Sequence, residues 1–314
     1  APQATAKPAA AAPKSLEKIK ITTPSASATN LPLYFAQEKG YFAEEGLDAE
    51  VFALQSAMQV PALLNGEIDY SALVGESIRV ALLGEPIRLL WVMTDKVPWT
   101  IVLAPGLTSA QQIEGKAWGI VGAAAPKYAA REVMKYFKLD QSKITFVTLD
   151  PSGGALAPLR SGSIAAANVT MPETKMAADA GLKLLINTGD VMETPTNGLS
   201  TSLKKIQQNP DQVKRVLRAI TRAMDYMKSH KDEAAQLITT RFSLEKQMAQ
   251  EVVEDEMRRW SRDGTVSDRG LQTQVDILGA DQQFPVKDLT VEQVKKTIDY
   301  TFLKEAQKEL GLPR

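Results

Sequence analysis

Four short segments of the chain have the residue types and the spacing that suit the binding of a small anion. They cover residues 25–30, 55–57, 75–77 and 122–126, and each lies where an extended, apolar run gives way to a helical pattern. The start of a helix leaves backbone N–H groups without partners and carries the positive end of the helix dipole. Such a segment can hold a carboxylate or a sulfonate without an arginine, although ordinary helix capping is the other interpretation of each one.

Several side chains in and beside these segments could contact a ligand directly. Asn30 and Ser56 could donate hydrogen bonds, whereas Glu76 could accept them from a ligand amine or amide, or simply complement the helix dipole. The aromatic rings of Tyr34 and Trp99 could stack on a flat ligand or fill the core. The other candidate positions at these helix starts are Ala57, Ser77, Ala124 and Ala125.

The usual residues of nucleophilic, general-base and metal catalysis are scarce in this chain. It has no cysteine, and its one histidine, His230, lies at the polar end of a predicted helix, where an imidazole suits the C-terminal carbonyl groups. No spaced pair of carboxylates stands out among the Asp and Glu residues. We therefore expect no catalytic residue, no metal site and no cofactor.

Length and composition favour two compact lobes or one large domain. The chain has 314 residues, of which 44% are hydrophobic and 24% are charged, and its 37 basic residues balance its 37 acidic ones. Without an excess of positive charge, a nucleic acid is not expected as a partner. No apolar run reaches the roughly 18 residues needed to cross a bilayer, so we expect no membrane-spanning segment.

The N-terminal residues differ in composition from the rest of the chain. Residues 1–15 are almost entirely Ala, Pro, Lys, Thr and Gln, and we expect residues 1–18 to form a disordered tether before the folded body. The chain begins at Ala1 rather than Met, which suggests that a targeting segment or tag has been removed. Together with the lack of cysteine, this favours an exported protein made with a signal peptide.

Strand and helix patterns alternate through the first two-thirds of the chain. The first series has predicted strands at residues 19–22, 49–54, 68–73 and 87–93, with helices at 30–40, 57–65 and 77–83. After a strand at 100–103, the second series has strands at 117–121, 144–149, 164–169 and 182–186, with helices at 126–137, 155–160 and 172–180. Only amphipathic helices are predicted from residue 209 onward. The alternation predicts an α/β fold with parallel sheets covered on both faces.

Residues 30–47, which read NLPLYFAQEKGYFAEEGL, resemble a sequence pattern of the solute-binding proteins of ABC importers for sulfonates, taurine, nitrate and the pyrimidine precursor of thiamine. The resemblance continues through LNGEID at residues 64–69, IEGK at residues 113–116 and NPDQV at residues 209–213. It covers nearly the whole chain after the N-terminal segment. Residues 30–47 are its most specific part, because the other matches are short.

The resemblance implies a type II periplasmic-binding-protein fold, in which two α/β lobes are joined by two crossover strands, here near residues 99–104 and 196–202. The first lobe would comprise residues 19–103 and 200–314, with the C-terminal helices packed on it. The second lobe would comprise residues 104–199. The ligand would lie in the cleft between the lobes, where the strand-to-helix loops converge.

Three further residues become candidates in this arrangement. Thr170 and Glu173 follow a predicted strand of the second lobe, and they could close over the ligand or form an ordinary capped helix start. Asn197, on the returning crossover, could reach the same cleft.

The resemblance also implies a function. The protein would capture one small organic anion, such as a sulfonate or carboxylate, or a pyrimidine-like heterocycle, and deliver it to an ABC permease with a cytoplasmic ATPase. It would be a monomer, periplasmic or anchored at the cell surface, and not an enzyme. Two alternatives use the same fold: a sensor that presents its ligand to a membrane receptor or kinase, and a pyrimidine-forming enzyme. That enzyme group uses histidine and cysteine around iron, whereas this chain has one histidine and no cysteine.

Overall fold

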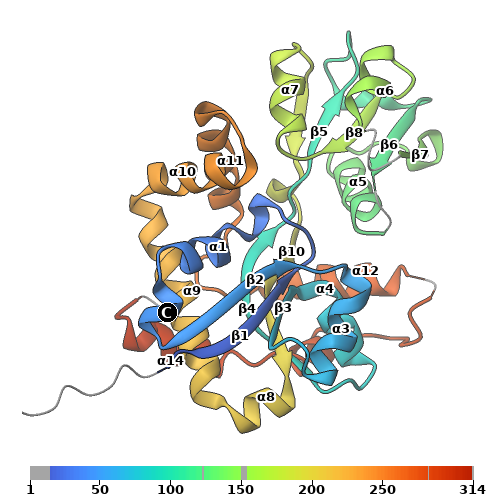
Figure 1. The fold of residues 1–314 in the computed structure, drawn as a ribbon. Helices are drawn as coiled ribbons and strands as arrows, with labels where there is room; N and C mark the ends of the chain where they lie inside the picture. The colour runs from blue at the N-terminus through green and yellow to red at the C-terminus, as the bar shows by residue number, and fades with distance from the viewer. Residues whose placement is uncertain (1–14, 122–123, 150–153, 282, 313–314) are drawn as a thin grey trace, which may run out of the picture.

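Two α/β lobes, each built on a five-stranded sheet, make up the computed structural model of this protein (Figure 1). The structure describes residues 15–121, 124–149, 154–281 and 283–312. Most of the predicted tether, residues 1–14, lies outside the described residues. Glu17 and Lys18, the last two residues of the predicted tether, already belong to the first β-strand and pair with the second β-strand. The folded body therefore begins before residue 19, where we predicted its start.

The sheet of the first lobe is mixed. Its strand order is β2-β1-β3-β10-β4, and the strands are β1 (Glu17–Thr23), β2 (Leu47–Ala53), β3 (Tyr70–Leu73), β4 (Ile87–Lys96) and β10 (Glu193–Ser202). β1 runs parallel to β2 and β3, whereas β10 runs antiparallel to β3 and β4. The prediction of a purely parallel sheet is therefore wrong, because β10 returns from the other lobe and enters the sheet in the opposite direction.

The sheet of the second lobe is mixed in the same way. Its order is β7-β6-β8-β5-β9, and the strands are β5 (Thr100–Leu103), β6 (Ala117–Val121), β7 (Thr145–Leu149), β8 (Ala166–Val169) and β9 (Leu184–Asn187). β6 is parallel to β7 and β8, but β5 is antiparallel to β8 and β9. Here the strand that arrives from the first lobe, β5, has the reversed direction.

Helices follow the strands in both series, as predicted. They are α1 (Leu31–Glu38), α2 (Tyr41–Glu44), α3 (Ser56–Asn65), α4 (Val74–Leu82), α5 (Ala124–Tyr136), α6 (Leu156–Ser161) and α7 (Glu173–Asp179), with short 3-10 helices η1 (Ala28–Asn30), η2 (Ala110–Ile113), η3 (Gln141–Lys143) and η4 (Thr188–Asp190). One boundary differs in a way that affects the candidate site. Helix α4 begins at Val74, directly after β3, so residues 75–77 lie within its first turn and form no loop.

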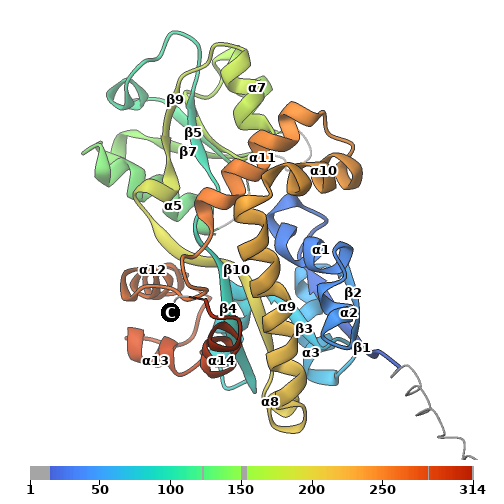
Figure 2. The ribbon, with the colours of Figure 1, turned by 90° about the vertical axis from the view of Figure 1, so that its left-hand side faces the viewer.

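The helices after residue 202 pack on the first lobe, which confirms that part of the predicted fold. They are α8 (Leu203–Gln208), α9 (Pro210–Ser229), α10 (Lys231–Phe242), α11 (Lys246–Arg259), α12 (Asp268–Gly279), α13 (Val291–Lys295) and α14 (Thr301–Glu309). Figure 2 shows α9 running along the first sheet. Its apolar side, which includes Val213, Leu217 and Ile220, is buried against one face of that sheet with α1. α4, α12 and α13 cover the other face.

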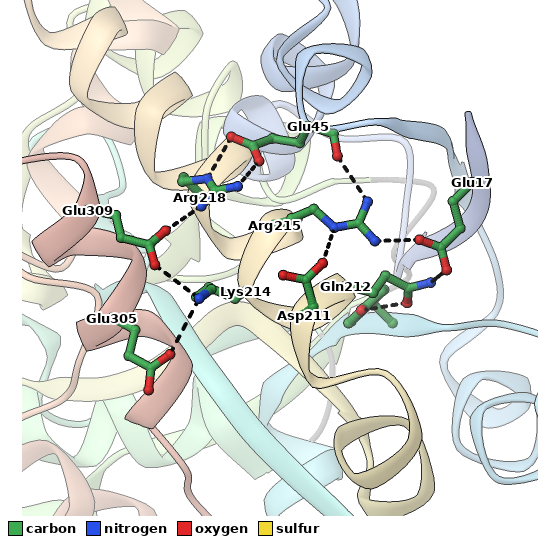
Figure 3. A network of polar contacts seen from close by, with 10 residues as sticks. Glu17, Glu45, Asp211, Gln212, Lys214, Arg215, Arg218, Glu305 and Glu309 are labelled. Atoms are coloured by element: carbon green, nitrogen blue, oxygen red, sulfur yellow. Dashed lines mark hydrogen bonds and ion pairs between the residues drawn. The ribbon is translucent and has the colours of Figure 1, made fainter. Parts of the chain in front are cut away.

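Ion pairs fasten α9 to the elements around it (Figure 3). Arg215 donates to Glu17 Oε2 at 2.6 Å and to the backbone carbonyl of Glu45 at 2.9 Å, which joins α9 to β1 and to the residue after α2. Arg218 pairs with both the carboxylate of Glu45 and that of Glu309 in α14. Because three elements distant in sequence meet on one helix, α9 is held firmly across the first lobe.

Two crossovers connect the lobes, as predicted, but both lie earlier in the chain than the predicted residues 99–104 and 196–202, which fall mainly in β5 and in β10. Residues 97–99 lead from β4 to β5, and η4 leads from β9 to β10. The two connections are hydrogen-bonded to each other. Thr188 donates to the Trp99 carbonyl through its backbone N–H at 2.8 Å and through its Oγ1 hydroxyl at 2.7 Å. None of the helices in the described ranges is both long and apolar enough to span a bilayer.

Candidate functional site

A cavity of about 270 Å³ lies where the two lobes meet. Its wall is made of residues 26–29 after β1, Pro98 in the first crossover, residues 170–172 after β8, and five side chains from the end of α10 through α11: Phe242, Leu244, Val252, Glu256 and Arg259. We call it the inter-lobe cavity. The loops after β1 and β8 follow the carboxyl ends of strands, which is where open α/β sheets bind ligands.

Asn30 fixes the loop that follows β1. It is buried at the end of η1, and its Nδ2 donates to the Ser25 carbonyl at 3.3 Å and to Thr29 Oγ1 at 3.4 Å. Its Oδ1 is buried without a partner among the described residues. Asn30 therefore shapes the backbone that lines the cavity.

Tyr34 supports the same loop from the core. Its hydroxyl lies 3.3 Å from Thr23 Oγ1 and 3.5 Å from the Ser25 carbonyl. Its ring is only 1% exposed and packs beneath the Arg241 guanidinium, 3.8 Å from the ring centroid, and beside Phe242. Of the two possibilities left open by the sequence, the structure places this ring in the core.

On the side of the second lobe, Thr170 and the two residues after it line the cavity. The neighbouring Met171 also packs against the core of the first lobe, so the lobes touch at this point. Glu173 points elsewhere, because its Oε1 accepts the N–H of Ala155 at 3.2 Å, just before α6. Of these two predicted residues, the structure brings only Thr170 to the cavity.

Two charged residues of α11, Glu256 and Arg259, form the polar part of the wall. Their side chains pair with each other and are each 5% exposed, and Arg259 Nη2 lies 3.3 Å from Asp255 Oδ2. Within the part of the chain that the structure describes, Glu256 Oε2 and Arg259 Nε are buried and have no hydrogen-bond partner. Burial raises the pKa of Glu256, and the positive charge of Arg259 opposes part of that rise.

Sequence reasoning missed Glu256 and Arg259, because residues 243–260 were interpreted only as a helix supporting the first lobe. Ala249, Val252, Glu256 and Arg259 follow one another at intervals of three or four residues, so the two charges stand on the buried face of an amphipathic helix. A charged residue at a position that the helical period assigns to the core is the signal that could have found them.

The predicted residues of the next two loops lie apart from this cavity. Ser56 and Ala57 begin α3 and are exposed. The Glu76 side chain is 40% exposed and lies 3.7 Å from Arg79 one turn along α4. Ser77 is buried, and its hydroxyl donates to the Leu73 carbonyl at 2.5 Å and lies 2.7 Å from Ser200 Oγ. The Ser77 hydroxyl is thus engaged within the first lobe.

The remaining candidates lie at the crossovers and at the start of α5. Trp99 is half-buried in an apolar cluster with Val97, Ala129 and Met192. Asn197 is half-buried in β10, and its N–H donates to Thr94 Oγ1 at 3.1 Å.

The predicted loop at residues 122–126 is described only in part, since Gly122 and Ala123 lie outside the described residues. Ala124 and Ala125 form the first turn of α5. Asn168 fixes the position of this turn, because its Nδ2 donates to the Pro126 carbonyl at 3.0 Å. Across the described ranges, the structure gathers no group of His, Cys, Asp or Glu side chains suited to a metal ion.

Comparison with known proteins agrees with this fold. A curated relative from Bacillus subtilis (strain 168), whose name assigns it the binding of aliphatic sulfonates, is 25% identical over 291 residues, or 88% of this chain and 85% of the relative. The periplasmic aliphatic sulphonate binding protein of Escherichia coli has a TM-score of 0.73 at 14% identity, with 92% of this chain and 99% of that chain covered. The periplasmic nitrate-binding protein of Synechocystis PCC 6803 also has a TM-score of 0.73, at 16% identity, with 95% and 90% covered.

At these identities the two solved structures establish a shared fold, and the predicted two-lobed periplasmic-binding-protein fold is confirmed. The sequence pattern of residues 27–234, more than half of the chain, matches the family described as NMT1/THI5 like. The resemblance first seen in residues 30–47 is confirmed with it. This protein belongs to the NMT1/THI5-like family.

Proposed function

We propose that this protein is the solute-binding protein of an ABC importer and that it binds one small molecule between its lobes without converting it. The inter-lobe cavity carries the proposal, because both lobes, the first crossover and α11 contribute to its wall. A ligand in this position contacts both lobes at once and favours the arrangement in which they enclose it. The relatives reported above, which are named as binding proteins, support the same conclusion.

The sequence divides the lobes at residues 103/104 and 199/200, but the pairing of β5 in the second sheet and of β10 in the first favours boundaries a few residues earlier. We therefore propose that the lobes divide at the β4 to β5 and β9 to β10 connections, where the chain of the described residues passes between the two sheets. Within the site, Asn30 and Tyr34 position the loop after β1, and Thr170 contacts the ligand from the second lobe.

Two ligand classes are candidates. The relatives named for sulfonates and nitrate favour a small anion, and we propose an organic one, such as a sulfonate or a carboxylate. A pyrimidine-like heterocycle is the second candidate, favoured by the presence of Glu256 in the cavity wall, because a carboxylate repels an anion. Either class fits a pocket whose walls are largely apolar and contain a few polar groups.

Ligand capture can be tested on the protein as purified. Native mass spectrometry should reveal one bound small molecule per chain, and a thermal-shift panel of sulfonates, carboxylates, heterocycles and sugars should raise Tm for one class. A ligand at a hundredfold excess over Kd stabilises the folded state by about 2.7 kcal/mol. A protein without a retained ligand and without a response to any member of the panel contradicts the proposal.

Delivery to a permease driven by a cytoplasmic ATPase is the second part of the proposal, and we place the protein outside the cytoplasm as a monomer. Deleting its gene should abolish uptake of the bound compound at low external concentration, and expressing it again should restore uptake. Unchanged uptake in the deletion strain contradicts delivery of the ligand to a permease and favours the alternative of a ligand sensor.

Size-exclusion chromatography with light scattering tests whether the protein is a monomer.

A further inference from the structure

A second and larger hollow lies beside the inter-lobe cavity. It has a volume of about 870 Å³, and both lobes contribute to its wall, with α7 and β9 of the second lobe facing α11 of the first (Figure 2). We call it the α7–α11 groove. The residues that line it include Ala178 of α7, Leu184 and Ile186 of β9, and Glu251, Asp255 and Arg258 of α11.

The groove and the inter-lobe cavity adjoin each other. On α11, Val252 lines the cavity, whereas its neighbour Glu251 lines the groove. In the segment after β8, Pro172 lines the cavity and Thr174 lines the groove. Because neighbouring residues of the same two elements border different hollows, only side chains separate one hollow from the other.

Met171 is the side chain at this boundary. Among the residues that the structure describes, Met171 alone lines both hollows. It belongs to the segment after β8 of the second lobe, yet it packs against the core of the first lobe and is half-buried. A methionine side chain is unbranched and adaptable. One flexible apolar side chain therefore stands between the cavity and the groove.

The sizes of the two hollows give this boundary a consequence for the solute. The cavity, at about 270 Å³, lies just below the roughly 300–1,000 Å³ of pockets that hold drug-sized ligands, whereas the groove lies within that range. The groove wall from the second lobe includes the apolar side chains of Ala178, Leu184 and Ile186. An apolar chain that passed Met171 would find apolar surface on the other side.

We propose that Met171 sets the upper size limit of the solute by closing the inter-lobe cavity against the α7–α11 groove. The inference rests on the proposed solute-binding function and adds the residue that determines how long the solute can be. The polar head of the solute lies in the cavity, and its apolar chain ends against Met171. When the side chain at position 171 is shortened, the chain of a longer solute continues into the groove.

Calorimetric titration of the full-length protein with two homologous series tests the size limit. The probes are linear alkanesulfonates, from ethanesulfonate to decanesulfonate, and linear carboxylates, from propanoate to undecanoate. In the parent, the affinity should rise by up to about fourfold for each methylene group that enters the cavity. It should fall again once the chain is long enough to reach Met171, so each protein has an optimal chain length.

Met171→Ala should move this optimum. The substitution removes Cγ, Sδ and Cε, so the optimal chain should become about three carbons longer, while short chains bind more weakly because they lose their contact with Met171. Met171→Leu, which nearly conserves the volume, should keep the optimum of the parent. If Met171→Ala weakens all chain lengths equally and leaves the optimum unchanged, Met171 only supports the packing of the loop and the inference is overturned.

Two further variants complete the test. Met176→Ala is the matched control, because Met176 lies on α7, is 47% exposed and belongs to the wall of neither hollow. It should keep both the affinities and the optimum of the parent. Met171→Val shortens the side chain with a smaller loss of packing, and should lengthen the optimal chain by at least about one carbon if the alanine variant does not fold. An unchanged optimum in Met171→Val then overturns the inference.

The two proposals fail in different ways. If native mass spectrometry finds a retained ligand but the optimal chain length does not change with the residue at position 171, the size limit is set elsewhere and the solute-binding function stands. If no member of either series binds the parent or Met171→Ala, the inference is overturned. The solute-binding function fails with it only when native mass spectrometry also finds no retained ligand and no class of the thermal-shift panel raises Tm.

Discussion

The hydroxyl of Tyr128 lies 3.2 Å from Asp276 Oδ2 and joins α5 of the second lobe to α12 on the first. The contact lies beside the apolar cluster of Trp99, Val97 and Met192, where the crossovers run. Burial, and then the charges of nearby carboxylates, raise the pKa of Tyr128 well above its ordinary value of 10.0. The phenol therefore keeps its proton and acts as the donor in a bond between the lobes.

Replacing Tyr128 by phenylalanine should remove this bond and little else. We expect the free energy of unfolding to fall by about 0.5–1.5 kcal/mol at pH 8, as for a typical intramolecular hydrogen bond. The raised pKa means that the contribution is complete below pH 10 and is lost as the pH rises through the folded value, because the unfolded tyrosine ionises first.

Urea unfolding of the parent and of Tyr128→Phe at pH 8 and pH 10.5 checks both statements. The difference between the two proteins should shrink at the higher pH. Tyr136→Phe, a change at a tyrosine that is 60% exposed, is the control and should leave the unfolding midpoint nearly unchanged. A difference that is constant with pH contradicts the role given to the Tyr128 proton.

Gly198 permits the close approach of β10, the strand that returns to the first lobe, to its neighbour β4. A Cβ at this position would lie 2.0 Å from the backbone oxygen of Trp91, and the register of the two strands shifts between Asn197 and Gly198. Because backbone atoms cannot move aside as a flexible side chain can, Gly198→Ala should cost about 2 kcal/mol or more. Gly279→Ala, at the end of α12, is the matched control, since a Cβ there meets no atom within 4 Å.

Chemical unfolding of the two alanine variants measures the difference. Gly279→Ala should be neutral or stabilising by up to about 1 kcal/mol, through the reduced freedom of the unfolded chain. If both substitutions have the same effect on stability, the packing of β10 against β4 is not the reason for glycine at position 198.

Asn168 connects the core of the second lobe to the start of α5. Its Oδ1 accepts from Trp118 Nε1 at 2.8 Å, and its Nδ2 donates to the Pro126 carbonyl at 3.0 Å. Asn168→Ala leaves the indole N–H and the carbonyl buried without these partners, and should cost about 2–4 kcal/mol. Thermal unfolding should show the loss, whereas Asn65→Ala, at an exposed asparagine, should stay within about 0.5 kcal/mol of the parent.

The alternation of strands and helices could be predicted from the sequence because it depends on local periodicity. The strand at Thr100–Leu103 was predicted with the boundaries that the structure shows. The direction of β5 and β10 was not, because antiparallel pairing arises from the path of the chain between lobes and leaves no trace in the pattern of either strand. The predicted start of α4, at residue 77, was too late. Val74 continues the apolar run of β3 in the sequence, although it is the first residue of the helix.

The candidate site was predictable only in outline. Asn30 and Thr170 could be chosen from the sequence because each follows the end of a strand. In the structure Thr170 lines the inter-lobe cavity, and Asn30 holds the loop after β1 that lines it. Burial of the Tyr34 ring depends on α10, more than 200 residues further along the chain, which places Arg241 and Phe242 against it. Glu256 and Arg259 reach the site through the packing of α11 against η1, a contact that no local pattern encodes.

Arg218 provides the last prediction, because it is the centre of the ion-pair network in Figure 3. It pairs with Glu45, whose side chain is 12% exposed, and with Glu309 of α14. Charge-assisted hydrogen bonds in such partly buried positions are stronger than surface ion pairs. Arg218→Met should therefore lower the free energy of unfolding by about 1–3 kcal/mol at pH 7. Arg222→Met, which removes a more exposed arginine one turn along α9, should cost less than about 1 kcal/mol.

The effect of Arg218→Met should also depend on pH and salt. Hydrogen bonds from Lys214 and then Arg218 hold the pKa of Glu309 below its ordinary value of 4.5. A lowered carboxylate pKa contributes stability above the unfolded value, and this contribution is lost as the pH falls through the folded value. The difference between the parent and Arg218→Met should thus begin to shrink as the pH falls below 4.5. It should also shrink in 1 M salt, where charges are screened over about 3 Å. Urea unfolding of the two proteins at pH 7 and pH 3.5 measures the difference in their free energies of unfolding. If this difference is the same at both pH values, the lost stability comes from packing of the arginine stem and not from its charge.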